Sequence, residues 1–161
     1  MTNQLDQDRK FMEIALQEAQ KAFSIGEVPV GAVLVQEETI ITRGHNQREQ
    51  RQDPTAHAEL IVIQGAAEKL RSWRLIDTTL YVTLEPCLMC AGAMLQARIP
   101  RLVLGTRDPK AGACGSLYTV HKDSRLNHQI DVIHGIEEEA CGNILKDFFQ
   151  QLREKQPLLI T

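Results

Sequence analysis

Aromatic residues and long apolar runs are scarce in this sequence. Phe, Trp and Tyr make up 4% of its 161 residues, and no segment approaches the roughly 18 consecutive apolar residues of a membrane-spanning helix. The first dozen residues are polar, include Asp6 and Asp8, and lack the apolar segment of a secretory signal. We therefore expect neither membrane insertion nor export.

A strong excess of one charge is also absent. The formal net charge of −3 differs from the basic balance that is common in nucleic-acid-binding proteins. Residues 96–130 nevertheless hold six Lys or Arg against two Asp or Glu. A solvated face accounts for most such runs, so charge alone leaves polyanion binding open.

Repeats, low-complexity stretches and linkers are absent too, and helical and strand patterns alternate along the chain. Helices are expected over residues 8–24, 55–70, 87–97 and 137–153, and strands over residues 28–36, 39–43, 80–84, 101–106 and 130–134. Thr55 is a natural N-cap for the second helix. This order predicts an α/β fold with three layers, α/β/α, around a central mixed five-stranded sheet whose first two strands form a hairpin.

Two short motifs carry the chemistry. Residues 55–59 read TAHAE and residues 85–90 read EPCLMC, which together match the H-x-E and P-C-x-x-C signature of zinc deaminases. His57, Cys87 and Cys90 supply one imidazole and two thiolates, which suffice to hold zinc and leave its fourth tetrahedral position open to water. Since zinc lowers the pKa of bound water towards neutrality, we expect one Zn²⁺ per subunit and hydrolysis by zinc-activated water.

A C-x-x-C pair also occurs in redox motifs and in structural zinc sites. A structural site needs a fourth protein ligand, which would have to be Cys114, Cys141 or another histidine. A redox pair gives no reason for His57 and Glu59. The catalytic site explains more of the sequence, and because its cysteines must remain thiolates we expect a reducing, cytoplasmic compartment.

Glu59 distinguishes an enzyme from a zinc-binding module. A carboxylate beside the activated water can take up its proton and pass it to the ring nitrogen and the departing amine. In a regular helix, however, residues two apart point in nearly opposite directions. His57 and Glu59 therefore converge only if Glu59 reaches past the metal or if the first helical turn is irregular, and the sequence leaves both alternatives open.

Longer segments resemble the bacterial tRNA-specific adenosine deaminase family, within the cytidine deaminase-like superfamily. They are residues 26–33 (GEVPVGAV), 44–46 (GHN), 53–59 (DPTAHAE), 83–93 (TLEPCLMCAGA) and 105–110 (GTRDPK). The zinc motifs alone indicate only the superfamily, and the flanking segments narrow the choice. The resemblance implies a single zinc-dependent deaminase domain over residues 1–161. It further implies a homodimer that converts the wobble adenosine to inosine in the anticodon loop of an arginine tRNA.

The resemblance leaves the four motif residues in the roles given above and adds a substrate pocket. Asn46 corresponds to the residue that hydrogen-bonds the purine, although Asn is also common in turns after strands. Val28, Pro29 and Ala58 correspond to positions that line the base pocket. For Val28 and Pro29, the apolar start of a strand is an adequate structural explanation.

Candidate RNA contacts follow from the same resemblance. Asp108 and Lys110 correspond to a loop that lies beside the anticodon nucleotides, although a polar turn needs no function. Phe148 and Phe149 correspond to an aromatic pair on the last helix. One of two adjacent helical residues usually faces outward, where its ring could stack on a splayed base, but both rings could equally pack into a core or dimer.

Three functions remain as hypotheses. A tRNA adenosine deaminase is favoured by the basic loop and the terminal aromatics. A zinc-dependent deaminase of a free nucleobase or nucleoside, such as guanine, cytosine or cytidine, would share every metal-binding residue. A zinc-stabilised RNA-binding subunit without chemistry would have no use for Glu59.

Overall fold

The computed structural model describes residues 3–155, and the first two and last six residues of the expected domain lie outside the described part. Among residues 3–155, no helix is both long and apolar enough to cross a membrane. The helices are α1 (Gln4–Ser24), α2 (Arg48–Arg51), α3 (Ala58–Leu70), α4 (Leu88–Gln96) and α5 (Glu138–Lys155), with a 3-10 turn η1 (Val120–Lys122). The strands are β1 (Gly31–Gln36), β2 (Thr39–His45), β3 (Thr78–Leu84), β4 (Arg101–Thr106) and β5 (Asp131–Ile133).

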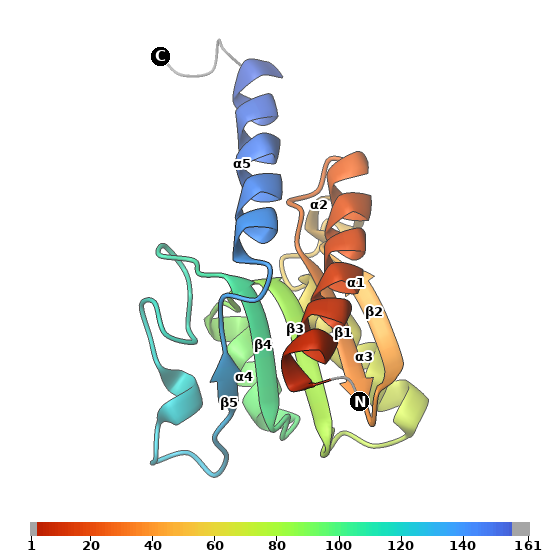
Figure 1. Ribbon diagram of the computed structural model, residues 1–161, viewed down its shortest axis with the longest axis vertical. Coiled ribbons are helices and arrows are strands. Elements are labelled where there is room, and N and C mark those ends of the chain that lie inside the picture. The colour runs from red at the N-terminus through yellow and green to blue at the C-terminus, as the bar shows by residue number, and fades with distance from the viewer. Residues whose placement is uncertain (1–2, 156–161) are drawn as a thin grey trace.

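The strands form one five-stranded sheet in the order β2-β1-β3-β4-β5. β1 pairs antiparallel with β2 and β3, whereas β3, β4 and β5 run parallel. Helices α1 and α5 cover one face, and α3 and α4 cover the other (Figure 1). The predicted mixed five-stranded sheet and its three-layer α/β/α architecture are therefore confirmed. The sequence did not predict the short helix α2, which lies in the expected loop between residues 44 and 54.

The predicted hairpin joins β1 to β2 through two acidic residues. Glu37 and Glu38 both have positive φ, 49° and 64°, which is the backbone of a type I′ turn. Gln36 pairs with Thr39 across it. The turn matches the right-handed twist of the strands, so a two-residue connection suffices even without glycine.

The α1 helix lies unusually close to the sheet at one glycine. A Cβ atom on Gly31 would stand 1.9 Å from the backbone oxygen of Ala15, so any larger residue would push α1 away. A buried ion pair anchors the same helix, because Arg101 donates to both oxygens of Asp8 at 2.9 and 2.7 Å. The Tyr81 hydroxyl donates to Asp8 at 2.8 Å. These contacts join α1 to β3 and β4.

Two buried clusters fill the layers on either side of the sheet. The larger cluster packs the apolar faces of α3 and α4 against the sheet, with Val62, Met94 and Leu80 completely buried. The smaller cluster lies under α1 and α5 and contains Met12 and Cys141. Because α3 and α4 are held by the same face, their first turns are brought together at one edge of the sheet.

Candidate metal centre and pocket

Two helix starts carry the metal-binding motifs. His57 is the N-cap of α3 with φ −78° and ψ 150°, and Cys87 is the N-cap of α4 with φ −76° and ψ 178°. Neither side chain makes a capping hydrogen bond. Cys90 lies in the first turn of α4 and is completely buried. The three side chains are thus free to face the space between the two helix starts, where the helix dipoles favour negative charge on sulfur.

The expectation that Thr55 caps the second helix is wrong. The backbone N–H and the hydroxyl of Thr55 both donate to Asp53 Oδ1, at 2.8 and 2.7 Å. This side-chain turn uses the Thr55 hydroxyl before the helix begins. The helix starts only after His57, three residues later than predicted.

The ligand atoms have the spacing of a tetrahedral zinc site. His57 Nδ1 lies 3.7 Å from Cys87 Sγ and 3.5 Å from Cys90 Sγ. With Zn–S near 2.3 Å and Zn–N near 2.0–2.1 Å, a tetrahedral ion would place nitrogen and sulfur about 3.6 Å apart. The three residues therefore fit zinc without rearrangement.

Within residues 3–155, this metal-ligand group contains only three residues. His57, Cys87 and Cys90 place one ligand atom each within 4.8 Å of the others, and no other Cys, His, Asp or Glu joins them. Neither Cys114 nor Cys141 supplies a fourth ligand. A tetrahedral ion held here would keep one position free, which is the arrangement of catalytic rather than structural zinc.

Glu59 lies in the first turn of α3, with 4% of its surface exposed, and lines the same cavity as His57 and Cys87. Because His57 precedes the helix on extended backbone, the step from His57 to Glu59 is not helical. Of the two alternatives, the structure thus has an irregular helix start. Burial raises the pKa of the Glu59 carboxyl, and the positive charge of His57 offsets this only in part.

The cysteine pair is electrostatically asymmetric. The hydrogen bond with Cys90 lowers the pKa of Cys87 to about 3, and the contact with His57 acts in the same direction. The hydrogen bond with Cys87, followed by burial, raises the pKa of Cys90. The hydrogen bond with Cys87 also raises the pKa of His57. Cys87 is therefore the more readily ionised thiol of the pair.

A cavity of about 640 Å³ opens beside these residues. The structure brings six of the predicted pocket and RNA-contact residues to its walls: Val28, Asn46, Ala58, Asp108, Lys110 and Phe149. Pro29 and Phe148 are buried and do not line it. The walls thus combine the two helix starts, the end of β2, the loop after β4 and one side of α5.

Asn46 follows the last residue of β2 and is buried. Its amide donates to the Val28 oxygen at 3.4 Å, and its Oδ1 accepts from the Arg48 N–H at 3.3 Å. Asn46 thus bridges a turn and also lines the cavity, and its hydrogen bond to the purine stays a prediction. These contacts fix the side-chain amide relative to the metal-binding residues.

The two phenylalanines near the end of α5 differ in environment. Phe148 is 8% exposed and packs edge-on against Phe23, with ring centroids 5.8 Å apart. Phe149 is 41% exposed and lines the cavity. One of the two adjacent rings, Phe148, is thus packed in the interior, and the other, Phe149, faces the cavity.

Sequence reasoning missed several residues of the cavity wall. Arg107 and Arg153 line it together with Lys110 and with Arg48, the first residue of α2. Arg107 belongs to the basic stretch of residues 96–130, which was a usable signal, but nothing in the sequence marks Arg153. Glu85 also lines the cavity although it is 3% exposed. Burial opposes its ionisation, but hydrogen bonds from Ser116 and neighbouring N–H groups lower the pKa of Glu85.

Comparison with known proteins identifies relatives of this chain. A family model described as MafB19-like deaminase matches residues 6–153. A tRNA-specific adenosine deaminase of Bacillus subtilis strain 168 is 49% identical over 152 residues, which is 94% of each chain.

Solved structures that resemble this chain also include deaminases. One, from a study of A-to-I editing by tRNA:A34 deaminases at the wobble position of transfer RNA, has a TM-score of 0.82 and 46% identity, and the match covers 84% of this chain and 99% of that one. A guanine deaminase from Bacillus subtilis has a TM-score of 0.60 and 34% identity over 66% of each chain.

Proposed function

We propose, from the premise that this chain belongs to the tRNA-specific adenosine deaminase family, that it hydrolyses the wobble adenosine of a tRNA anticodon loop to inosine. The supporting observation is the combination of a three-ligand metal cluster with a buried carboxylate in one cavity. We further propose that the metal is zinc, that the substrate is an arginine tRNA, that the chain forms one catalytic domain, and that the protein is cytoplasmic.

His57, Cys87 and Cys90 would hold the zinc, and their spacing supports this assignment. When bound, zinc supplies a Lewis acid that brings the pKa of a water molecule close to neutrality. Glu59 would take one proton from the attacking water and deliver it to N1 of the adenine ring, and would then carry a second proton, from the hydroxyl added at C6, to the departing amine. A raised pKa suits this cycle, because the carboxyl must be protonated and deprotonated in each turnover.

The base would lie between the strand ends and the start of α3. Asn46 offers a donor and an acceptor to the edge of the purine, and its contacts with Val28 and Arg48 hold the amide in place. Val28 and Ala58 give the base an apolar surface, and Pro29, which is buried next to Val28 in the chain, is proposed to shape this wall without touching the base. This enclosure would exclude bulk water from the reacting carbon.

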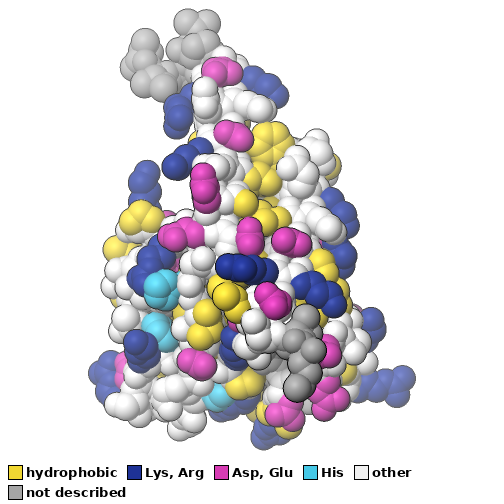
Figure 2. Space-filling view, viewed as in Figure 1, with side chains coloured by type: hydrophobic (Ala, Val, Ile, Leu, Met, Phe, Trp, Pro, Cys, Tyr) yellow, Lys and Arg dark blue, Asp and Glu magenta, His cyan; other side chains and the backbone are white. Residues whose placement is uncertain are grey.

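The cavity mouth carries features suited to single-stranded RNA. Lys110, Arg107, Arg48 and Arg153 place four cations around it, and Asp108 adds an acceptor. Phe149 presents a partly exposed ring on which a base can stack. On the α1–α5 face, Lys and Arg are interspersed with Asp and Glu (Figure 2). This face therefore offers no uniformly basic surface to RNA, and we assign the RNA contacts to the cavity mouth.

The activity test compares an adenosine-bearing anticodon stem-loop with free adenosine, cytidine and guanine. Zinc-loaded protein is incubated with each, and the products are identified by mass spectrometry. We expect inosine in the stem-loop at its wobble position only. The likeness to a guanine deaminase favours guanine as the second candidate. Deamination of a free base with none in the stem-loop would replace the tRNA proposal by that one.

The paired phenylalanines give a test of the RNA contact. Phe148→Ala should lower the free energy of unfolding by about 3–5 kcal/mol, because it empties a buried site. Phe149→Ala should change stability little, but weaken stem-loop binding by about 1–3 kcal/mol through lost stacking. Urea unfolding and fluorescence anisotropy measure the two quantities. Equal effects of both substitutions on stability, with none on binding, would count against a stacking role for Phe149.

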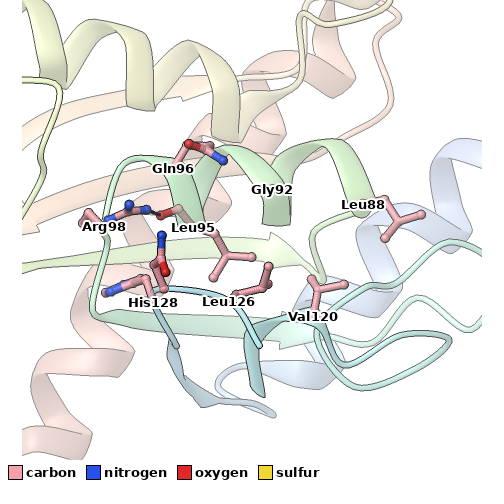
Figure 3. A pocket seen from close by; sticks show the side chains of 9 residues that line it. Leu88, Gly92, Leu95, Gln96, Arg98, Val120, Leu126 and His128 are labelled. Atoms are coloured by element: carbon pink, nitrogen blue, oxygen red, sulfur yellow. Dashed lines mark hydrogen bonds between the residues drawn. The ribbon is translucent and has the colours of Figure 1, made fainter. Parts of the chain in front are cut away.

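We also propose a homodimer that uses the exposed face of α4. A hollow of about 370 Å³ lies between α4 and the segment that begins with η1. Its apolar lining residues are Leu88, Leu95, Val120 and Leu126, and polar side chains, among them Gln96, Arg98 and His128, line the rest (Figure 3). Leu88 and Leu126 are also exposed at 48% and 42%. Apolar side chains gathered around a hollow are typical of a surface that another protein covers.

Gly92 permits a clean test of this dimer. It lines the hollow, and a Cβ atom at this position would meet nothing within 4 Å. Gly92→Glu should therefore preserve the fold of the subunit but introduce charge into the interface, and light scattering should report monomers. Gly92→Ala is the matched control and should remain dimeric. A Gly92→Glu protein that still forms the wild-type dimer would exclude this face.

A further inference from the structure

Glu85 is a buried carboxylate in the connection between β3 and α4, two residues before Cys87. Its Oε1 accepts from the Asp108 N–H at 3.1 Å and from the Ser116 hydroxyl. Its Oε2 accepts from the N–H groups of Cys114 and Ser116, both at 3.0 Å. All four donors belong to the loop after β4, so one side chain fastens both ends of the segment from residue 108 to residue 116.

The loop closes tightly around this carboxylate. A Cβ atom on Gly112 would stand 2.2 Å from Glu85 Oε2 and 2.6 Å from the Asp108 oxygen, so only glycine fits there. Two backbone hydrogen bonds flank the side chain: Glu85 N–H donates to Thr106 at 2.9 Å, and Ala113 N–H donates to Pro86 at 2.9 Å. The loop is therefore attached to the chain on both sides of Glu85.

The same loop forms one wall of the cavity, through residues 107–111. Without the carboxylate, three buried or partly buried N–H groups would have no other hydrogen-bond acceptor among the described residues. Unsatisfied donors of this kind favour a rearranged loop. A loop that must be ordered on binding costs affinity, whereas a loop already in its bound shape does not.

We propose that Glu85 is a positioning residue that holds residues 108–111 in their RNA-binding shape before the substrate arrives, and so sets affinity for the anticodon loop rather than the rate of the chemical step. This inference rests on the proposed function for its substrate. It assigns to Glu85 no contact with the reacting atoms. Its action on RNA passes through Asp108 and Lys110.

Glu85→Gln should affect the two ends of the loop differently. An amide oxygen in the place of Oε2 still accepts from Cys114 and Ser116. The amide nitrogen would replace Oε1. It can donate to the Ser116 hydroxyl, which then accepts instead of donating, but it cannot accept from the Asp108 N–H because both groups are donors. The substitution should therefore release the Asp108 end, close to the cavity, and leave the Ser116 end attached.

Two further variants act on the same contact without altering Glu85. Gly112→Ala pushes against the carboxylate, and Ser116→Ala removes one donor while leaving the Asp108 hydrogen bond. Ser72→Ala is the control, because the Ser72 hydroxyl donates to the Arg74 oxygen at a surface loop. If Glu85→Gln fails to fold, the Gly112 and Ser116 variants carry the test.

The experiment joins hydrogen exchange with kinetics on zinc-loaded protein. In the absence of RNA, we expect amide exchange around Asp108 to be about tenfold faster in Glu85→Gln and Gly112→Ala than in wild type, and less affected in Ser116→Ala. With the stem-loop, KM should rise about tenfold in the first two variants, while kcat and zinc content remain near wild type. The Ser72→Ala control should match wild type in every measurement.

Two results would overturn the proposal. One is unchanged exchange at residues 108–111 together with unchanged KM. The other is a fall in kcat or in bound zinc at constant KM, which would make Glu85 a support of the metal centre instead. Failure of the proposed function looks different, because the wild-type protein itself would then leave the stem-loop unmodified while the exchange comparison still reports on the loop.

Discussion

A Glu59→Ala protein is expected to bind zinc normally and to form almost no inosine. The carboxylate is buried beside the ligand cluster and is the proposed carrier of every proton in the reaction. Removing a general acid–base group typically lowers a rate by about 10²–10⁴-fold, and here a single residue serves both transfers. Turnover on the stem-loop and zinc per chain, by elemental analysis, measure the two quantities.

Two variants sharpen the test of Glu59. Glu59→Gln preserves the shape of the side chain but not its basicity, so it should be as inactive as Glu59→Ala. Glu68→Ala removes an exposed carboxylate from the same helix and should keep wild-type activity. Substantial turnover by either Glu59 variant would refute the assignment. Loss of zinc along with activity would instead show that Glu59 maintains the metal site.

Metal removal should abolish activity and also destabilise the fold. The three ligands lie at the starts of α3 and α4, so a bound ion would join two helices that are far apart in the sequence. At a free zinc concentration about 1,000 times Kd, such an ion would add about 4 kcal/mol to the free energy of unfolding. Dialysis against a chelator should lower both turnover and the thermal midpoint, and added zinc should restore them.

Cysteine substitutions localise this effect. Cys87→Ala should reduce zinc to well below one ion per chain and remove activity. Cys141→Ala is the control, because Cys141 is a buried thiol on α5 that packs over Gly105 and is not part of the His57, Cys87 and Cys90 group. It should keep its zinc and its activity even if packing loss lowers the thermal midpoint. Full activity after complete metal removal would contradict the zinc proposal.

The order of helices and strands was predictable because hydrophobic periodicity encodes it directly. The strand expected over residues 101–106 matches β4 residue for residue. Helix starts were harder, since several residues can cap. Thr55 has the right chemistry for an N-cap, but Asp53 captures its hydroxyl. The start of α3 at Ala58 therefore depends on a competition between neighbouring side chains that no periodicity reveals.

The candidate site was only partly visible in the sequence. The metal-binding motifs are local and could be found from spacing, and the resemblance supplied Asn46 and Phe149. Arg153 and Glu85 could not be found, because Arg153 reaches the cavity only through the fold and the hydrogen-bond donors to Glu85 are distant in sequence. Glu85 in particular lies 31 positions from Ser116, which it holds. Position relative to Cys87 gave no hint that its partners were in the loop after β4.

The cavity walls divide along the chain in a way that bears on how this enzyme could be redesigned. The proposed metal ligands and Glu59 all lie before residue 91, whereas the loop after β4 and the Phe149 side of α5 come from the second half of the chain. Libraries confined to residues 107–111 and to the outer positions of α5 could thus vary the nucleotide context that is accepted. Directed evolution on this plan should leave Glu85 and Gly112 unchanged, because in our proposal they hold the loop after β4 in position.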